Sequence, residues 1–253
     1  MIVVGLLLLG LGIADIVRAS TRSLAGGIVA GAAAFTIGAL VVDLAHWWAW
    51  SLAAIGAVAA WVLLTRGGSR AGQRRAAKGA VLGLAAVIVG LWLASGSLGL
   101  DIDSRVAWLW SSDSGTSLSY STSTILLVSG IVAFLIESGN VVVRIALSSS
   151  AVTGDQDDVE SVRRFLMPGE ANTGGLKGGR LIGPFERLFI LALVLAGEYT
   201  AIGAIVAAKG IIRFPEISRN DTNGSKAEEF LVGSFASWSL VLASVLLIAA
   251  ALA

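Results

Sequence analysis

Residues 230–252 read FLVGSFASWSLVLASVLLIAAAL, a run without a single charged side chain. A helix needs about 20 mostly apolar residues to cross about 30 Å of hydrocarbon. Barrel strands would instead alternate apolar and polar residues over about 10 positions. The run is continuous, so it predicts a membrane-spanning helix. Other runs have the same character, and the predicted spans are 2–17, 24–42, 47–64, 79–99, 123–143, 188–208 and 230–252.

The composition supports this fold class. Of the 253 residues, 56% are hydrophobic and 14% are charged, against about 25% charged in a typical soluble domain. So few charges cannot coat a soluble fold. We therefore predict an all-α, polytopic transmembrane helical bundle of about seven spans. The net charge of +1 gives no overall basic field for nucleic acid.

The residue counts also narrow the chemistry. The chain has no cysteine, which removes disulfides, thiol catalysis and thiolate metal sites. A single histidine argues against a multi-histidine haem or metal site. The sequence contains no His-Glu-x-x-His and no Gly-x-Ser-x-Gly motif. We therefore predict no catalytic residue, no metal ion and no cofactor.

The spans divide the chain into regions. A cytoplasmic segment carries a predicted short helix from Asp155 to Leu166, with acidic residues early and basic residues late, as the helix dipole favours. No basic residue precedes the first span, so we expect that span to be retained rather than cleaved as a signal peptide. The regions are an N-terminal four-helix bundle (1–99), an outer polar loop (100–122), a fifth span (123–143), the cytoplasmic segment (144–187) and a C-terminal transmembrane hairpin (188–253).

Basic residues predict the orientation, because inner loops of membrane proteins are rich in Lys and Arg. Seven spans with the N-terminus outside and the C-terminus inside leave Arg105 and four basic residues of loop 209–229 outside. Alternatively, segment 188–208 re-enters the membrane, with a break at Gly197-Glu198, and that loop lies inside. We favour the plain span. The preference for Arg over Lys is typical of a GC-rich bacterial genome, which predicts a bacterial inner membrane.

Tryptophans mark the outer boundary of the predicted bundle. An indole ring favours the headgroup level, where its N–H stays wet. The sequence places tryptophans after the second and fourth spans, at Trp47, Trp48, Trp50, Trp108 and Trp110. We interpret them as membrane anchors.

Ionisable residues in a bilayer are costly, so each is a functional hypothesis. Asp15 lies one turn before Arg18, a spacing that predicts a local ion pair near the inner interface. Asp43 and His46 lie three apart and would share a helical face if the second helix extends that far. They form either a paired interfacial site or a proton or ligand site.

Two glutamates lie deeper in the predicted spans. Glu137 follows a run of apolar residues, and Glu198 is the most central carboxylate of all. A central carboxylate must either be protonated or pair with a group on another helix. Structural pairing and a proton or ion pathway are both open for these residues.

Small residues are frequent in the second span. Gly27 and Gly31 form a small-xxx-small pair, which allows helix backbones to approach closely. This face serves packing inside the bundle, or else self-association or contact with other membrane subunits.

The most distinctive region covers residues 177–240. It contains the segments LIGPFER (181–187), AAKGIIRF (207–214) and EFLVGS (229–234). These resemble an uncharacterised family of bacterial integral membrane proteins known as a domain of unknown function. Gly210 and Phe230 depart from the residues that this family often has, Ser and Tyr. The resemblance implies residence in a membrane and carries no activity.

The resemblance directs attention to charged residues at the ends of the last spans. They would form an interfacial charge network that clamps the C-terminal hairpin, or a site for lipid headgroups, because basic side chains at an interface attract anionic lipid. The residues are Glu186, Arg187, Lys209, Arg213 and Glu228.

The leading functional prediction is an integral membrane scaffold or accessory subunit of a larger membrane assembly, without catalysis of its own. The alternative is a small proton- or ion-coupled transporter or channel that uses Glu198 and Glu137. A third hypothesis is a lipid-handling membrane enzyme.

Overall fold

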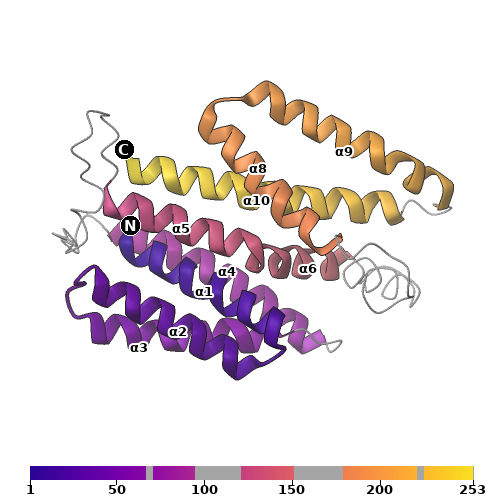
Figure 1. Ribbon diagram of the computed structural model, residues 1–253. Coiled ribbons are helices and arrows are strands. Elements are labelled where there is room, and N and C mark those ends of the chain that lie inside the picture. Colours follow the sequence, from indigo (N-terminus) through magenta and orange to yellow (C-terminus); the bar gives the residue numbers. More distant parts are fainter. Residues whose placement is uncertain (67–70, 95–120, 151–178, 221–224, 253) are drawn as a thin grey trace. The chain divides into compact units, whose positions relative to one another are not determined.

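The computed structural model describes residues 1–66, 71–94, 121–150, 179–220 and 225–252, and every element in these ranges is a helix (Figure 1). Five helices are long and apolar enough to cross a membrane, or six if the bent pair α5–α6 counts as one span. The predicted all-α polytopic fold class is confirmed. The helices are α1 (Ile2–Thr21), α2 (Leu24–Val41), α3 (Trp47–Leu64), α4 (Ala71–Ala94), α5 (Thr122–Ile136), α6 (Ser138–Ser150), α8 (Gly179–Ala196), α9 (Tyr199–Asn220) and α10 (Ser225–Leu252).

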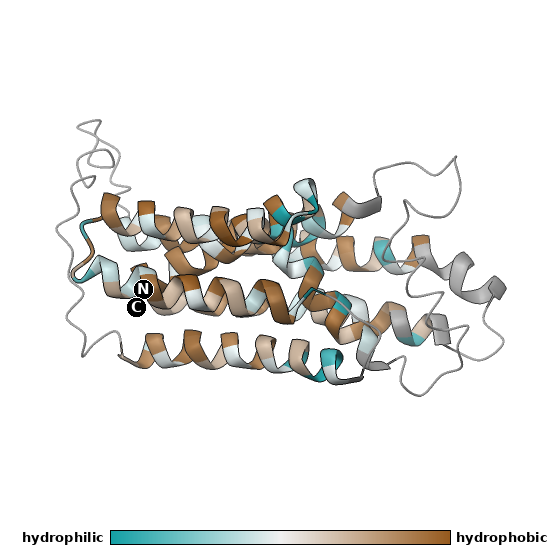
Figure 2. Ribbon diagram, turned by 90° about the horizontal axis from the view of Figure 1, so that it is seen from below, coloured by the Kyte–Doolittle hydropathy of each residue, from teal (hydrophilic) through white to brown (hydrophobic). Residues whose placement is uncertain are grey.

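The residues cluster into two units, which are described separately. Unit 1 comprises Met1–Ser138 with Leu247–Ala253, and unit 2 comprises Gly139–Leu246. Along the helices, hydrophobic residues occupy the middle and hydrophilic residues gather toward the ends (Figure 2). That distribution fits helices with a hydrocarbon layer around their centres and headgroups at their ends.

Helix α1 is the centre of unit 1, since 67% of its apolar window is buried. It packs against α2 and α5. A Cβ added to Gly5 would lie 2.7 Å from the backbone nitrogen of Leu127, and one added to Gly12 would lie 2.6 Å from the carbonyl oxygen of Ala133. No side chain fits in these gaps, so glycine is what allows α1 and α5 to touch backbone to backbone.

The glycine pair of α2 is also occupied within unit 1. A Cβ on Gly27 would lie 2.7 Å from the carbonyl oxygen of Ala14, and one on Gly31 would lie 2.5 Å from that of Gly10. Both neighbours belong to α1. Gly27 and Gly31 therefore already pack against α1, and self-association through them would have to displace α1.

Helix α4 is peripheral by comparison. Only 6% of its apolar window is buried, against 28% for α3. It begins at Ala71 rather than at the predicted residue 79, so Arg74, Arg75 and Lys78 lie within its first turns. The first turns of α4 are polar and basic. A hydropathy profile detects only the apolar part that follows them, so it places the start of the helix too late.

The turn after α2 corrects the prediction for Asp43 and His46. The helix ends at Val41, and Asp43 adopts the left-handed conformation with φ 54°. The backbone N–H of Leu44 donates to the carbonyl of Ala39 at 2.9 Å, and that of Asp43 donates to the carbonyl of Leu40 at 3.2 Å. This is a Schellman termination. Asp43 and His46 are therefore turn residues and do not share a helical face.

The fifth predicted span is not straight. Helices α5 and α6 meet at a bend of 50°, and Glu137 stands at the junction. Its φ of −118° departs from the helical value. The continuous helix predicted over 123–143 is therefore wrong at this residue, although the bent pair together retains the apolar character of a span.

The sixth predicted span is also broken. Helix α8 ends at Ala196, and Gly197 takes φ 78°. The N–H of Glu198 donates to the carbonyl of Leu193 at 2.9 Å, and that of Gly197 donates to the carbonyl of Val194 at 3.1 Å, which is again a Schellman termination. The continuous helix predicted over 188–208 is wrong, and the break lies at Gly197-Glu198, where the re-entrant alternative put it.

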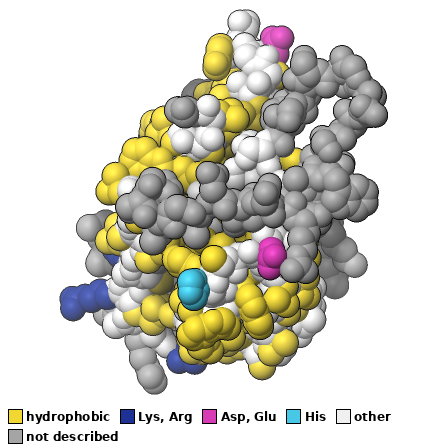
Figure 3. All heavy atoms as spheres, turned by 90° about the vertical axis from the view of Figure 1, so that its left-hand side faces the viewer, with side chains coloured by type: hydrophobic (Ala, Val, Ile, Leu, Met, Phe, Trp, Pro, Cys, Tyr) yellow, Lys and Arg dark blue, Asp and Glu magenta, His cyan; other side chains and the backbone are white. Residues whose placement is uncertain are grey.

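Several predictions fall outside the described residues. They are the short helix from Asp155 to Leu166, most of the outer loop, and the anchors Trp108 and Trp110. Trp47 and Trp48 are described. They are 40% and 58% exposed at the start of α3, as membrane anchors require. His46 lies beside hydrophobic side chains at the surface (Figure 3).

Candidate functional site: two charged clusters and a basic hollow

A buried carboxylate joins α1, α3 and Ser138 within unit 1. Asp15 is fully buried, and its Oδ1 lies 2.8 Å from the Arg18 guanidinium. Its Oδ2 accepts hydrogen bonds from the indole N–H of Trp61 at 2.8 Å and from the hydroxyl of Ser138 at 2.6 Å. The predicted Asp15–Arg18 ion pair is confirmed. The partners on α3 and at the start of α6 were not predicted.

Arg18 extends this cluster to the end of α3. Its Nη1 donates to the carbonyl of Val62 at 3.2 Å and to the hydroxyl of Thr65 at 3.3 Å. The carbonyl belongs to the last turn of α3, where helices leave acceptors without an internal partner. The cluster therefore fixes the ends of α1 and α3 together, and its chemistry is that of a structural ion pair.

A second charged cluster joins three helices of unit 2. The ammonium of Lys209 on α9 lies 2.7 Å from both carboxylate oxygens of Glu186 on α8. The indole N–H of Trp238 on α10 donates to Glu186 Oε1 at 3.2 Å. The ammonium also lies 5.8 Å from the ring centre of Phe230 and 5.7 Å from that of Trp238, within cation–π range.

This second cluster contains one pair of the predicted charge network and adds two aromatic rings to it. Glu186 and Lys209 were predicted together, whereas Phe230 and Trp238 were not recognised as their partners. Phe230 opens the most apolar part of α10, and Trp238 follows two turns later. Two aromatic residues about two helical turns apart could have indicated that this face of α10 contacts a lysine.

The remaining members of the predicted network lie elsewhere. Arg187 is buried, and its Nη2 donates to Asn140 Oδ1 at 2.6 Å. A Cβ on Gly139 would lie 2.9 Å from Arg187 Nε, so this glycine makes room for the guanidinium. Glu228 is exposed in the first turn of α10. Arg213 lies in α9, and its side chain is outside the described residues.

The proposed pathway residues lie at breaks and turns. Glu198 is exposed between α8 and α9, and Glu137 stands at the α5–α6 junction. Asp43 and His46 are exposed in the turn between α2 and α3. Within the described ranges, no group of three His, Asp or Glu side chains could hold a metal ion.

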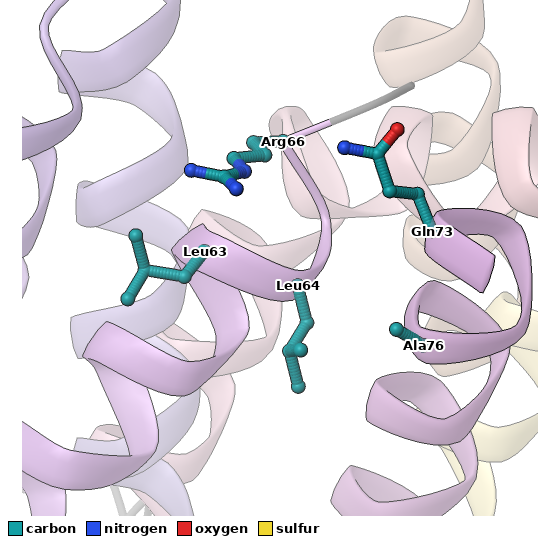
Figure 4. Close-up of a pocket in the computed structure, with 5 residues that line it drawn as sticks. All are labelled: Leu63, Leu64, Arg66, Gln73 and Ala76. Atoms are coloured by element: carbon teal, nitrogen blue, oxygen red, sulfur yellow. The ribbon is translucent and has the colours of Figure 1, made fainter. Parts of the chain in front are cut away.

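A hollow of about 110 Å³ opens between the end of α3 and the start of α4 (Figure 4). Leu63, Leu64 and Ala76 form its apolar part, and Arg66 and Gln73 stand at its polar rim. Sequence analysis did not identify this hollow, because its walls come from two different helices and the distance between them depends on the tertiary structure.

Comparison of the chain with models of protein families, with curated proteins and with solved structures gave no match. The resemblance of residues 177–240 to an uncharacterised membrane family therefore stays a prediction.

Proposed function

We propose that this protein is an integral membrane scaffold or accessory subunit that binds a transmembrane helix of another protein along α4. The observation that carries this proposal is a row of small, exposed residues on that helix. Gly79, Gly83, Ala86 and Gly90 follow a four-three-four spacing, which places them on one face. A Cβ on any of the three glycines would meet nothing within 4 Å.

Glycines elsewhere in unit 1 show what such a row can do. Gly5, Gly12 and Gly31 each accept the backbone of a neighbouring helix at a distance that no side chain would permit. Interfaces in membranes depend on this close packing, because lipid tails are as apolar as the helices themselves. The row on α4 has the same composition and stands open to a further helix.

Charge at the start of α4 favours a different protein over a second copy. Arg75 lies one turn before Gly79, Lys78 lies directly before it, and both side chains are exposed. Two copies packed side by side along this row would bring these cations together, which disfavours self-association. A partner helix with acidic residues at the same end would complement them.

Purification from the native membrane in mild detergent tests the proposal. We expect the chain to bring down a stoichiometric membrane protein, and Gly83→Leu to abolish the association because it fills the row. Gly56→Leu is the matched control, since Gly56 is an exposed glycine of α3 with nothing within 4 Å of an added Cβ. A chain that purifies alone, or equal loss in both variants, would contradict the proposal.

A second function is supported by a specific observation, namely that Glu137 and Glu198 both stand at breaks in apolar helical segments. Broken helices expose backbone groups that coordinate ions in many transporters. Proton-coupled flux in vesicles would test this alternative. We expect Glu198→Gln to abolish flux and Glu228→Gln, an exposed carboxylate at the start of α10, to leave it intact.

The membrane and the orientation belong to the same proposal. The residue usage of the chain supports a bacterial inner membrane. The apolar part of α9, Tyr199–Ile212, is shorter than a span. At 1.5 Å per residue it covers about 21 Å, against about 30 Å of hydrocarbon. We therefore propose that α8 and α9 form a re-entrant hairpin that enters and leaves from the inner side.

The distribution of basic residues supports this topology over the seven-span alternative. With a re-entrant hairpin and an outer N-terminus, every one of the 18 Lys and Arg residues except Arg105 lies inside or at the inner interface. An even number of crossings places both termini outside.

A further inference from the structure

We infer that the hollow between α3 and α4 binds an anionic phospholipid, with the lipid phosphate at Arg66 and Gln73 and an acyl chain against Leu63, Leu64 and Ala76. The hollow lies at the start of α4 and adjoins the proposed partner row, since Ala76 lies three residues before Gly79 and seven before Gly83. It is independent of the proposed function.

The lining of the hollow changes from apolar to polar along its length. Figure 4 shows Leu63 and Leu64 on the last turn of α3, with Ala76 on α4 across from Leu64. Gln73 reaches across from α4, and Arg66 stands where the chain leaves α3. A phospholipid changes character in the same order, from acyl chain to phosphate. The site therefore matches one amphipathic molecule better than a free ion or a free hydrocarbon.

The position of the hollow matches the membrane boundary. The candidate span of α3 ends at Leu64, and Arg66 follows two residues later. The leucines are therefore at the depth of acyl chains, and the arginine is at the depth of headgroups. A guanidinium at that level can donate paired hydrogen bonds to a phosphate.

The volume fits a headgroup fragment. The hollow holds about 110 Å³, whereas one water occupies about 30 Å³ of liquid volume. It can therefore accept a group the size of a phosphate. The rest of the lipid would lie along the outer surface, where Leu63 and Leu64 are 45% and 41% exposed.

Charge at this end of unit 1 selects an anion. The sequence contains no Asp or Glu from residue 44 to residue 100. Asp15 is buried and already paired with Arg18, which in turn contacts the end of α3. In the described part of the chain, no ion pair with a carboxylate involves Arg66, Arg74, Arg75 or Lys78. The basic groups therefore attract an external anion.

Native mass spectrometry of the detergent-purified full chain tests the site. The probes are dioctanoyl phosphatidylglycerol, dioctanoyl phosphatidylcholine and glycerol 3-phosphate. We expect phosphatidylglycerol to bind several-fold more tightly than the other two. We expect Arg66→Gln to weaken it about fivefold, the effect of one basic side chain near a membrane surface, and Arg66→Lys to restore part of the binding.

Arg22→Gln is the matched control, because Arg22 is an exposed arginine at the end of α1 and does not line the hollow. It should change phosphatidylglycerol binding by less than twofold. Gln73→Leu gives a second variant that keeps every charge, and it should weaken binding because leucine has no N–H to donate to the phosphate. Thermal unfolding of each variant verifies that it folds.

The alternatives give distinct outcomes. Equal weakening by Arg22→Gln and Arg66→Gln would reduce the effect to general electrostatic attraction and overturn the site. Equally tight binding of phosphatidylcholine would mean that only the acyl chains are bound, and it would overturn the selectivity for an anionic lipid. Glycerol 3-phosphate that binds as tightly as phosphatidylglycerol would assign the site to a soluble phosphate and overturn the lipid proposal.

Discussion

At the scale of single residues, the stability of unit 1 depends on the buried carboxylate of Asp15. A carboxylate that is fully buried must be matched by donors, since an unpaired charge in a medium of low dielectric constant is costly. Trp61 and Ser138 donate hydrogen bonds to Oδ2, and the Arg18 guanidinium lies 2.8 Å from Oδ1 as the counter-charge. The pair therefore fixes which helices can be neighbours, at a cost that only complete pairing offsets.

Asp15→Asn is expected to lower the free energy of unfolding by about 3 kcal/mol, because the Arg18 guanidinium, which is 13% exposed, loses its counter-charge. Thermal unfolding in detergent, followed by tryptophan fluorescence, measures the loss. Glu198→Gln is the control, since Glu198 is an exposed carboxylate between α8 and α9. It should shift stability by no more than about 0.5 kcal/mol. Equal losses would mean that the buried pair has no special role.

At the scale of helices, glycine position decides which faces touch. Gly12 meets the backbone of α5, whereas Gly83 on α4 faces open space. The residues around them do not distinguish the two glycines, since each stands among aliphatic side chains of an apolar helix. Substitution by alanine separates them.

Gly12→Ala should destabilise the purified chain by about 1–3 kcal/mol or more, because the added methyl overlaps the α5 backbone and forces the two helices apart. Gly83→Ala should cause no loss, since its Cβ enters open space and alanine is the better helix former. Thermal unfolding of both proteins is the measurement. A destabilised Gly83→Ala, or an unchanged Gly12→Ala, would show that these faces are packed differently.

The clamp formed by Glu186 and Lys209 makes a prediction at the same scale. Both side chains are partly shielded, with 12% and 25% exposure, so their coupling should exceed that of a surface pair. A double-mutant cycle with Glu186→Gln and Lys209→Met should give an interaction free energy of about 1–3 kcal/mol. Additive effects of the two substitutions would indicate that the aromatic rings, and not the ion pair, hold α8, α9 and α10 together.

At the scale of the whole molecule, topology follows from whether α8 and α9 re-enter the membrane. The chain contains no cysteine, so single-cysteine variants report their side without background. With a membrane-impermeant maleimide on intact bacterial cells, we expect His46→Cys and Ala251→Cys to be labelled. Arg22→Cys and Asn220→Cys should react only after the membrane is opened.

The seven-span alternative gives the opposite result at two of these positions. It would expose Asn220→Cys to the outside and protect Ala251→Cys. His46→Cys and Arg22→Cys serve as references, because the two topologies agree on them. Both put His46, in the α2–α3 turn, outside and Arg22, at the end of α1, inside.

Sequence patterns alone predict the helical membrane class, the ends of α2 and α3, the C-terminal end of α10, and the Asp15–Arg18 pair. Long apolar runs and local spacing encode these features, and both are properties of neighbouring residues. The structure was needed to locate the break at Glu137 and to choose the break at Gly197-Glu198 over a continuous helix. Hydropathy averages over a window, whereas a break depends on one residue such as Gly197 adopting a positive φ.

The same reason explains the sites. Glu186, Lys209 and Asp15 were identified because charged residues are conspicuous in an apolar chain. Their partners Trp61 and Trp238 were not, because an aromatic residue in a hydrophobic helix looks the same whether it faces lipid or a carboxylate. Which glycine row is filled and which stays open is likewise absent from the sequence pattern, since it depends on which helices the fold brings within contact of each other.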